Sequence, residues 1–286
     1  KVNITAPADH IIGSTGTLQN ASSVLTKEQQ ARLKTAKTAS EPVLIVTQEE
    51  AEAAEKQKAT KTKMWIFHAT NVRDFAFASS RKFIWDAIGV KLDDGSTTMA
   101  MSFYPKEGNP LWGQYSTRVV AHTVKSYSKH TFDYPYPVAI SVHSKWNGME
   151  YPMICFNAPR PLPDGTYWGE PANGEQWMHS KYGLISVIIH EVGHNYFPMI
   201  VNSDERQWTW MDEGLNSVLD KLNVEIPPKH ASMLPKNEEA KGGGESDALV
   251  MGLMDKLEVM VSDLQESTFD VVNSSSTDEN QDTVFG

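Results

Sequence analysis

The sequence predicts a mixed α+β protein, and three observations lead to this class. Short segments rich in aromatic and β-branched residues mark strands up to about residue 80. From about Arg81, strands alternate with longer helical segments. Two helices then end at prolines, Pro198 and Pro227, which cannot continue a helix. With 286 residues, of which 40% are hydrophobic, the chain can bury the core of one large domain or two modest ones.

Residues 1–80 are expected to form a β-rich N-terminal region. The Glu/Ala/Lys run in this region indicates a helix with a solvated surface. The predicted elements are a helix at Thr26–Lys37, a strand at Val43–Val46, a helix at Gln48–Lys58, and strands at Met64–Phe67 and Phe75–Phe77.

Residues 81–235 are expected to mix strands and helices around the chemically active residues. The second of the two helices that end at prolines has Leu215, Val218, Leu219 and Leu222 at the spacing of one buried face. Its neighbours are a long Pro- and Gly-rich loop and a helix that ends by Pro198. The predicted elements in order are a strand at Thr98–Tyr104, a helix at Leu111–His130, a strand at Val138–Val142, an extended segment at Tyr151–Phe156, a loop at Asn157–Gly174, and helices starting near Gly183 and Met211.

Residues 236–286 differ in composition from the rest and are predicted to be a low-complexity or diverged segment. Lys236–Ser246, with three consecutive Gly, indicates a flexible linker. Ala248–Leu264 is at most a short amphipathic helix, and Ser274–Asp282 has the composition of a loose tail.

Charge and hydropathy exclude two kinds of partner. A net charge of -10 without a basic stripe argues against nucleic acid, because phosphate binding needs Lys and Arg in excess on one face. The longest apolar run, Leu184–Ile189, is far shorter than the ~20 residues of a membrane-spanning helix.

Cys155 is the single cysteine, so the chain forms no intrachain disulfide. None of these observations determines an oligomeric state.

The strongest motif is His190-Glu191-Val192-Gly193-His194, which follows an apolar helical segment. Positions four apart lie on one face of a helix, so both imidazoles can reach one metal ion. Glu191 then lies beside them, near a water bound to the metal.

A third ligand is available in Glu213, which follows His194 after eighteen intervening residues on the next predicted helix. A hydrolytic zinc needs three protein ligands and one open position for water, and two His with one Glu supply that set. The sequence therefore predicts one Zn²⁺ per chain, held by His190, His194 and Glu213.

These residues resemble the aminopeptidase N family of gluzincin zinc metallopeptidases. In that family the third ligand occurs in a Trp-Leu-Asn-Glu-Gly-Phe-like segment at the same separation, and here Trp210-Met211-Asp212-Glu213-Gly214-Leu215 stands in its place. Members also carry a Gly-Ala-Met-Glu-Asn segment whose Glu holds the free amine of the substrate. The corresponding segment here is Asn147-Gly148-Met149-Glu150-Tyr151, in which Met149 and Glu150 match.

The resemblance implies a thermolysin-like catalytic domain at residues 81–235, preceded by the end of a β-rich N-terminal domain at residues 1–80. It implies a peptidase that releases N-terminal amino acids from peptides by attack of a zinc-activated water, with Glu191 as the general base. Glu150, Met149 and Gly148 would then bind the substrate, a peptide with a free N-terminus. Bacterial relatives are often exported, which indicates the periplasm, the cell envelope or secretion.

Departures from the family pattern keep two alternatives open. The family uses a Tyr about eighty residues past the metal helix to stabilise the tetrahedral intermediate, and this sequence has no Tyr after Tyr196. The activity is therefore expected to be reduced. A catalytically weak zinc-binding relative that acts as a peptide-binding module is one alternative, and an endopeptidase without an amine anchor is the other. Trp208 and Trp210 are expected to pack beneath the site, and Asn195 and Asp212 to support the ligands.

Overall fold

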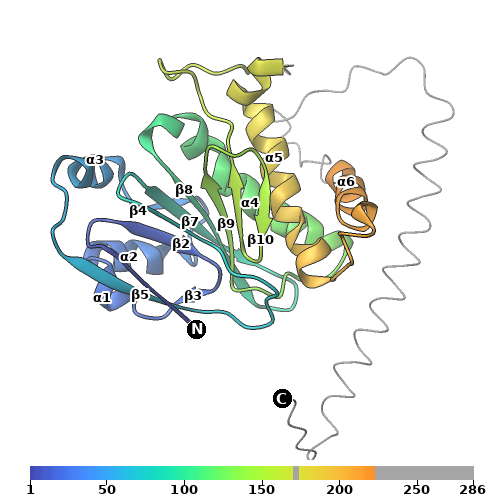
Figure 1. Cartoon of the computed structure of the whole chain (residues 1–286), viewed down its shortest axis with the longest axis horizontal. Coiled ribbons are helices and arrows are strands. Elements are labelled where there is room, and N and C mark those ends of the chain that lie inside the picture. Colours follow the sequence, from blue (N-terminus) through green and yellow to red (C-terminus); the bar gives the residue numbers. More distant parts are fainter. Residues whose placement is uncertain (170–173, 223–286) are drawn as a thin grey trace, which may run out of the picture. The chain divides into compact units, whose positions relative to one another are not determined.

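The computed structural model describes residues 1–169 and 174–222 (Figure 1). The helices are α1 (Ala21–Val24), α2 (Lys27–Ala36), α3 (Gln48–Lys56), α4 (Leu111–His130), α5 (Lys181–Gly193) and α6 (Glu213–Leu222). The strands are β1 (Val2–Pro7), β2 (Ile11–Ser14), β3 (Thr17–Leu18), β4 (Val43–Val46), β5 (Thr62–His68), β6 (Phe77–Ser80), β7 (Ile84–Lys91), β8 (Thr97–Tyr104), β9 (Val138–His143), β10 (Met149–Tyr151) and β11 (Ile154–Asn157).

A six-stranded mixed sheet forms the centre of the described chain, in the order β10-β11-β9-β8-β7-β4. Strand β9 runs parallel to both β8 and β11, and the other pairs are antiparallel. Strand β10 is therefore an edge strand, joined to β11 by a tight turn in which Met153 has φ 68°.

The two faces of this sheet are covered by different parts of the chain. Helix α4 packs on β7, β8 and β9, and Ser116 of α4 lies 2.7 Å (Oγ to Oγ) from Ser102 of β8. On the opposite face, Trp85 and Met101 line a pocket of about 410 Å³, which is also lined by Leu33 of α2 and by residues of β2 and β3. Alternate residues of the central strands are thus buried on both sides.

The N-terminal region adds two small sheets, β1-β5-β3 and β2-β6. Helices α2 and α3 each begin with a capping box, formed by Thr26 with Gln29 and by Thr47 with Glu50. In each box the hydroxyl accepts from the N3 backbone N–H while the N3 side chain accepts from the cap N–H, which fixes where the helix starts.

Helix α5 lies against α4 and β11, close to the edge strand β10 (Figure 1). Past α5 the chain makes an irregular helical stretch, Asn195–Ile200, with a non-helical break at Phe197. A loop of residues 201–212, named the ligand loop below, then leads to α6, which packs on α5.

The predicted α+β class, with a β-rich N-terminal region, is confirmed. The predicted helix at Leu111–His130 and the predicted strand at Val43–Val46 have the bounds of α4 and β4. Strand β4, inside the predicted first region, is hydrogen-bonded to β7 of the second region, and the division at residue 80 stays a prediction. The predictions for residues 236–286 lie outside the described residues.

Two predicted elements were wrong in detail. Tyr151–Phe156 is not one extended segment but a hairpin, because the chain reverses at Met153. The strand predicted at Phe75–Phe77 lies further along the chain, at Phe77–Ser80. No helix among the described residues has the length and apolar character needed to cross a bilayer.

Candidate metal centre

Helix α5 carries both predicted histidine ligands, and its sequence explains its position. Ser180 caps the helix by accepting a hydrogen bond from the Gly183 N–H at 2.9 Å. The apolar residues that follow are buried against α4 and β11. Near the C-terminal end, a side chain in place of Gly193 would collide with the hydroxyl of Tyr127 and with Asn216. Close packing therefore fixes the helix that presents His190 and His194.

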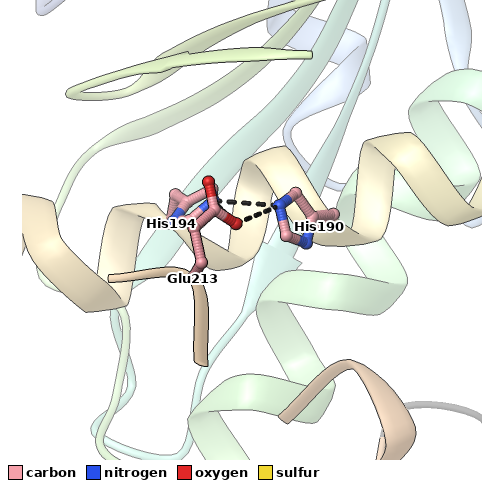
Figure 2. Close-up of side chains that lie close together, drawn as sticks. All are labelled: His190, His194 and Glu213. Atoms are coloured by element: carbon pink, nitrogen blue, oxygen red, sulfur yellow. Dashed lines mark hydrogen bonds and ion pairs between the residues drawn. The ribbon is translucent and has the colours of Figure 1, made fainter. Parts of the chain in front are cut away.

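The three predicted ligands converge on one point (Figure 2). The Nε2 atoms of His190 and His194 lie 3.1 Å apart. Oε2 of Glu213 lies 3.1 Å from Nε2 of His190 and 3.6 Å from Nε2 of His194. Ligands about 2.0–2.2 Å from a tetrahedral zinc lie roughly 3.3–3.5 Å from one another. The three separations therefore fit a tetrahedral zinc with one position left open.

The hydrogen bonds of the imidazoles support the same conclusion. Nδ1 of His194 lies 2.9 Å from the carbonyl oxygen of Phe197, which can only accept, so this nitrogen carries the proton. Nδ1 of His190 donates in the same way to Oδ2 of Asp220 at 2.9 Å. In the neutral rings both Nε2 atoms are then lone-pair donors that face a carboxylate oxygen. Three such atoms need a cation between them.

Electrostatics give a second reason to expect a cation at this point. Burial lowers the pKa of His190, but the hydrogen bond to Asp220 and the charges of Glu191 and Glu213 outweigh that effect and raise it to about 9. The cluster thus favours a positive charge at His190, and a metal ion competes with the proton for the same Nε2 lone pair. The residues present fit a zinc ion.

A second set of residues, which does not reach the zinc position, orients the ligands through hydrogen bonds. The hydroxyl of Tyr127 lies 2.7 Å from Oδ1 of Asp220 and 2.7 Å from Oδ1 of Asn216. Asn216 donates from Nδ2 to the carbonyl of His190 at 2.7 Å. The sequence reasoning missed Asp220, although its place seven residues after Glu213, two turns along the same helix, is a signal that could have found it.

Asp212 and Asn195 were both predicted to support the ligands. Oδ1 of Asp212 lies 2.9 Å from Nδ1 of His194 but forms no hydrogen bond with it. The N–H of that nitrogen points to Phe197, so Asp212 acts on His194 through its charge. Oδ1 of Asn195 accepts from the Met153 N–H at 2.6 Å, which connects the end of α5 to the hairpin turn after β10.

Glu191, the predicted general base, is buried beside the ligands and is 5% exposed. Its Oε2 has no hydrogen-bond partner among the described residues. Burial raises the pKa of Glu191 to about 8, against the effect of His190, and Glu150 and Glu213 add to the rise. A buried carboxylate with a free oxygen can take up a proton near neutral pH.

The three predicted substrate-binding residues lie at the edge strand next to this site. Carboxylate oxygens of Glu150 and Glu191 and a ring nitrogen of His194 lie within 4.8 Å of one another. Gly148 has φ +80° and lies against Glu191. Met149 is 40% exposed. The structure therefore brings Glu150 and Gly148 to the site and leaves Met149 facing solvent.

The prediction that Trp208 and Trp210 pack beneath the site was wrong. They are 54% and 60% exposed, because they belong to the ligand loop at the surface. The space beneath the site is filled by Tyr127 and Tyr196, whose rings lie 5.1 Å apart. Tyr196 is fully buried and donates to the Val124 carbonyl at 3.0 Å, which confirms its predicted packing role.

Comparisons with known proteins find a distant structural likeness. No protein-family model and no curated protein matches the sequence. The solved structures that match include an M1 zinc metallopeptidase from Deinococcus radiodurans, at 14% identity and a TM-score of 0.49 over 78% of this chain and 39% of that one. A variant of the same enzyme bound to the substrate Tyr-Ser-Ala gives 14% identity and a TM-score of 0.46. This chain spans about 40% of the length of that variant. At this level of similarity, a function for this chain rests on its own residues.

Proposed function

We propose that this chain is a zinc-dependent metallopeptidase that releases amino acids from the N-termini of peptides. The observation that carries the proposal is the convergence of His190, His194 and Glu213, with Nε2 of the two histidines 3.1 Å apart. The buried carboxylate of Glu191 beside them adds a group that can accept a proton from water.

A zinc ion bound by these three ligands supplies a Lewis acid that lowers the pKa of water and polarises a carbonyl. Glu191 contributes the proton transfer. Its unpartnered Oε2 can accept a proton from the attacking water and then donate it to the leaving amine. Asp220 and the Phe197 carbonyl hold the two imidazoles in the tautomer that leaves Nε2 free.

The edge strand β10 offers a place for the peptide. Among the described strands none pairs with its outer side, and it lies next to α5. A peptide that adds to such an edge is held by backbone hydrogen bonds, which give register without requiring a particular sequence. A peptide bound in this way would have its first peptide bond near the proposed zinc.

Glu150 would limit cleavage to the first residue. Glu150 lies on the edge strand itself, and its carboxylate is within 4.8 Å of a carboxylate oxygen of Glu191 and a ring nitrogen of His194. A free α-ammonium at this point gains a charge-assisted hydrogen bond, whereas a blocked N-terminus leaves the carboxylate without a partner.

An endopeptidase and a weakly active zinc-binding relative are the two other candidates. The first would use the same zinc chemistry without the amine anchor. The second would bind zinc and peptides at the same residues with little or no turnover.

Turnover of paired peptides with free and acetylated N-termini, by protein of known zinc content, separates the three candidates. The proposal predicts cleavage of the free peptides only. Glu150→Ala should reduce that cleavage while leaving the zinc content unchanged. Equal cleavage of both forms would favour an endopeptidase, and zinc binding without any turnover would favour the peptide-binding relative.

A further inference from the structure

The three proposed zinc ligands differ in how firmly the protein holds them. His190 lies on α5 and His194 is the C-cap residue of that helix, whose apolar residues are part of the core. Glu213 comes at the start of α6, and its side chain is 54% exposed. In the ligand loop before it, residues 201–211 are not buried, and Asp212 is. Core packing of α6 begins beyond Glu213, at Asn216 and Leu219, so it does not hold residues 201–211.

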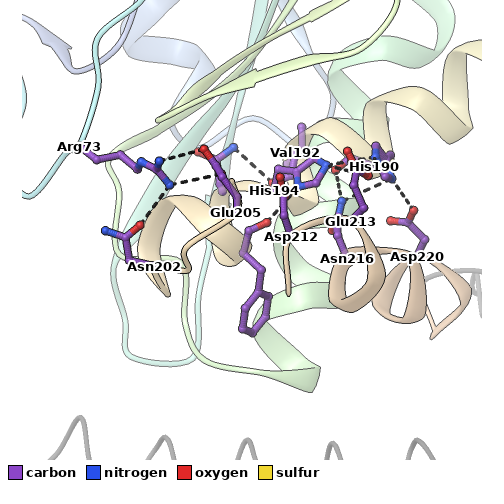
Figure 3. A network of polar contacts seen from close by, with 12 residues as sticks. Arg73, His190, Val192, His194, Asn202, Glu205, Asp212, Glu213, Asn216 and Asp220 are labelled. Carbon is purple, nitrogen blue, oxygen red and sulfur yellow. Dashed lines mark hydrogen bonds and ion pairs between the residues drawn. The ribbon is translucent and has the colours of Figure 1, made fainter. Parts of the chain in front are cut away.

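Arg73, from the segment between β5 and β6, holds the ligand loop by its guanidinium (Figure 3). Nη2 donates to Oε1 of Glu205 at 3.0 Å, and Nη1 lies 3.5 Å from Oε2 of the same carboxylate. Nη1 also donates to Oδ1 of Asn202 at 3.1 Å. The side chains of Arg73 and Glu205 are only 31% and 32% exposed. A two-point ion pair of this kind fixes direction as well as distance.

The segment that carries Arg73 is itself anchored on both sides. Before it, the Asn71 carbonyl accepts from the hydroxyl of Tyr136 at 2.9 Å. After it, Ala76 exchanges hydrogen bonds with Thr15, through its N–H at 3.1 Å and its carbonyl at 3.0 Å. The Thr15 hydroxyl donates in turn to the Pro152 carbonyl, in the turn that follows β10, at 2.8 Å. Arg73 thus projects from a fixed part of the chain.

Backbone hydrogen bonds continue from the Arg73 contact to the third ligand. The Trp208 N–H donates to the Asp204 carbonyl at 2.8 Å, and the Met211 N–H donates to the Trp208 carbonyl at 2.9 Å. Asp212, the last residue of the loop, has its carboxylate 2.9 Å from Nδ1 of His194. Restraining the loop at Glu205 therefore restrains the residue next to Glu213.

We propose that Arg73 is a positioning residue for the zinc site. By holding Glu205 and Asn202, it keeps Glu213 at the distance from the two imidazoles that zinc requires. This role rests on the proposed zinc function. Through this one side chain, the N-terminal region influences the zinc affinity of a site that is more than a hundred residues away in sequence.

The test is the zinc dissociation constant of the full chain, measured by competition with a chelator. Arg73→Ala and Glu205→Gln should each raise it roughly three- to tenfold, below the 10- to 100-fold typical of groups that bind a ligand directly. The double variant should lose no more zinc affinity than Arg73→Ala alone, because Glu205→Gln removes a contact that Arg73→Ala has already removed. The charge exchange Arg73→Glu with Glu205→Arg should restore part of the affinity. The rise in the zinc dissociation constant caused by Arg73→Ala should be smaller at high salt, because the ion pair between Arg73 and Glu205 is partly exposed.

A matched control separates positioning from a general loss of stability. Arg32 pairs with Glu50 at 2.8 Å, with side chains 34% and 31% exposed, on α2 and α3. Arg32→Ala should leave the zinc dissociation constant unchanged, whatever it does to the unfolding temperature of the metal-free chain. An unchanged constant in Arg73→Ala, or an equal rise in Arg32→Ala, would overturn the role of Arg73. Failure of the unaltered chain to bind zinc would instead overturn the proposed function itself.

Discussion

The backbone of Gly148 passes so close to the carboxylate of Glu191 that a Cβ at residue 148 would lie 2.5 Å from Oε1. The same residue has φ +80°, which side chains other than Gly rarely adopt. Gly148→Ala should therefore displace Glu191 and lower turnover by up to about 100-fold, as a misplaced catalytic group does. The zinc content should be unchanged, and both quantities are measured on the same preparation.

Gly95 provides the control for this substitution. It has a similar φ of +86°, but a Cβ there would meet nothing within 4 Å. Gly95→Ala carries the same backbone strain without the clash and should keep full turnover. Equal loss in both variants would show that strain, and not the contact with Glu191, is responsible.

The proton transfer assigned to Glu191 is tested by Glu191→Gln. Glutamine keeps the shape of the side chain but cannot accept the proton, a role typically worth about 10²- to 10⁴-fold in rate. We expect bound zinc at the level of the unaltered chain and turnover reduced by this factor. A variant that keeps normal turnover would show that another group is the base.

Asp220 should matter for zinc affinity although it does not reach the zinc position. It accepts the Nδ1 proton of His190 and so keeps Nε2 of that ring free for the metal. Asp220→Ala should raise the zinc dissociation constant roughly 10- to 100-fold. Asp164→Ala, which removes an exposed carboxylate that accepts hydrogen bonds from Thr166 in its own turn, should not change it. An unchanged dissociation constant in Asp220→Ala would show that Asp220 does not orient His190 for zinc.

Asp86 predicts a pH dependence of stability that does not involve the metal site. Burial raises its pKa to about 6, although Thr117 and Tyr104 donate hydrogen bonds to it. The unfolded value is 3.8, so between these two values the folded chain binds more protons than the unfolded chain. The free energy of unfolding should therefore fall by about 2 kcal/mol as pH rises from about 4 to 6.

Urea unfolding of the metal-free chain at several pH values measures this contribution. Asp86→Asn should flatten the curve across the window relative to the unaltered protein. Asp164→Asn should leave the fall in place, because hydrogen bonds from Thr166 outweigh the small effect of burial and hold the pKa of that carboxyl below its usual range. Identical curves for the unaltered chain and Asp86→Asn would contradict the assignment.

The zinc ligands could be predicted from sequence because their relationship is local. His190 and His194 are one helical turn apart, and the spacing to Glu213 spans a short connection. Arg73 could not be predicted in this way, since 132 positions separate it from Glu205 and a single ion pair leaves no periodic signal. Contacts of that kind follow from the tertiary fold alone.

Strand β7 shows why part of the fold was missed. Its first four residues, Ile84–Ala87, are all buried, so it lacks the alternation that marks a half-exposed strand. The hairpin at Met153 was missed for another reason. Its turn contains neither Gly nor Asn, the residues that usually signal a positive φ. In both places tertiary packing outweighs the local pattern.

Zinc stoichiometry tests the central claim most directly, by elemental analysis of the purified chain and of His194→Ala after dialysis. The three donor atoms of His190, His194 and Glu213 predict one zinc per chain in the unaltered protein and none in the variant. An unaltered chain that retains no zinc and takes up none when it is added would contradict the account.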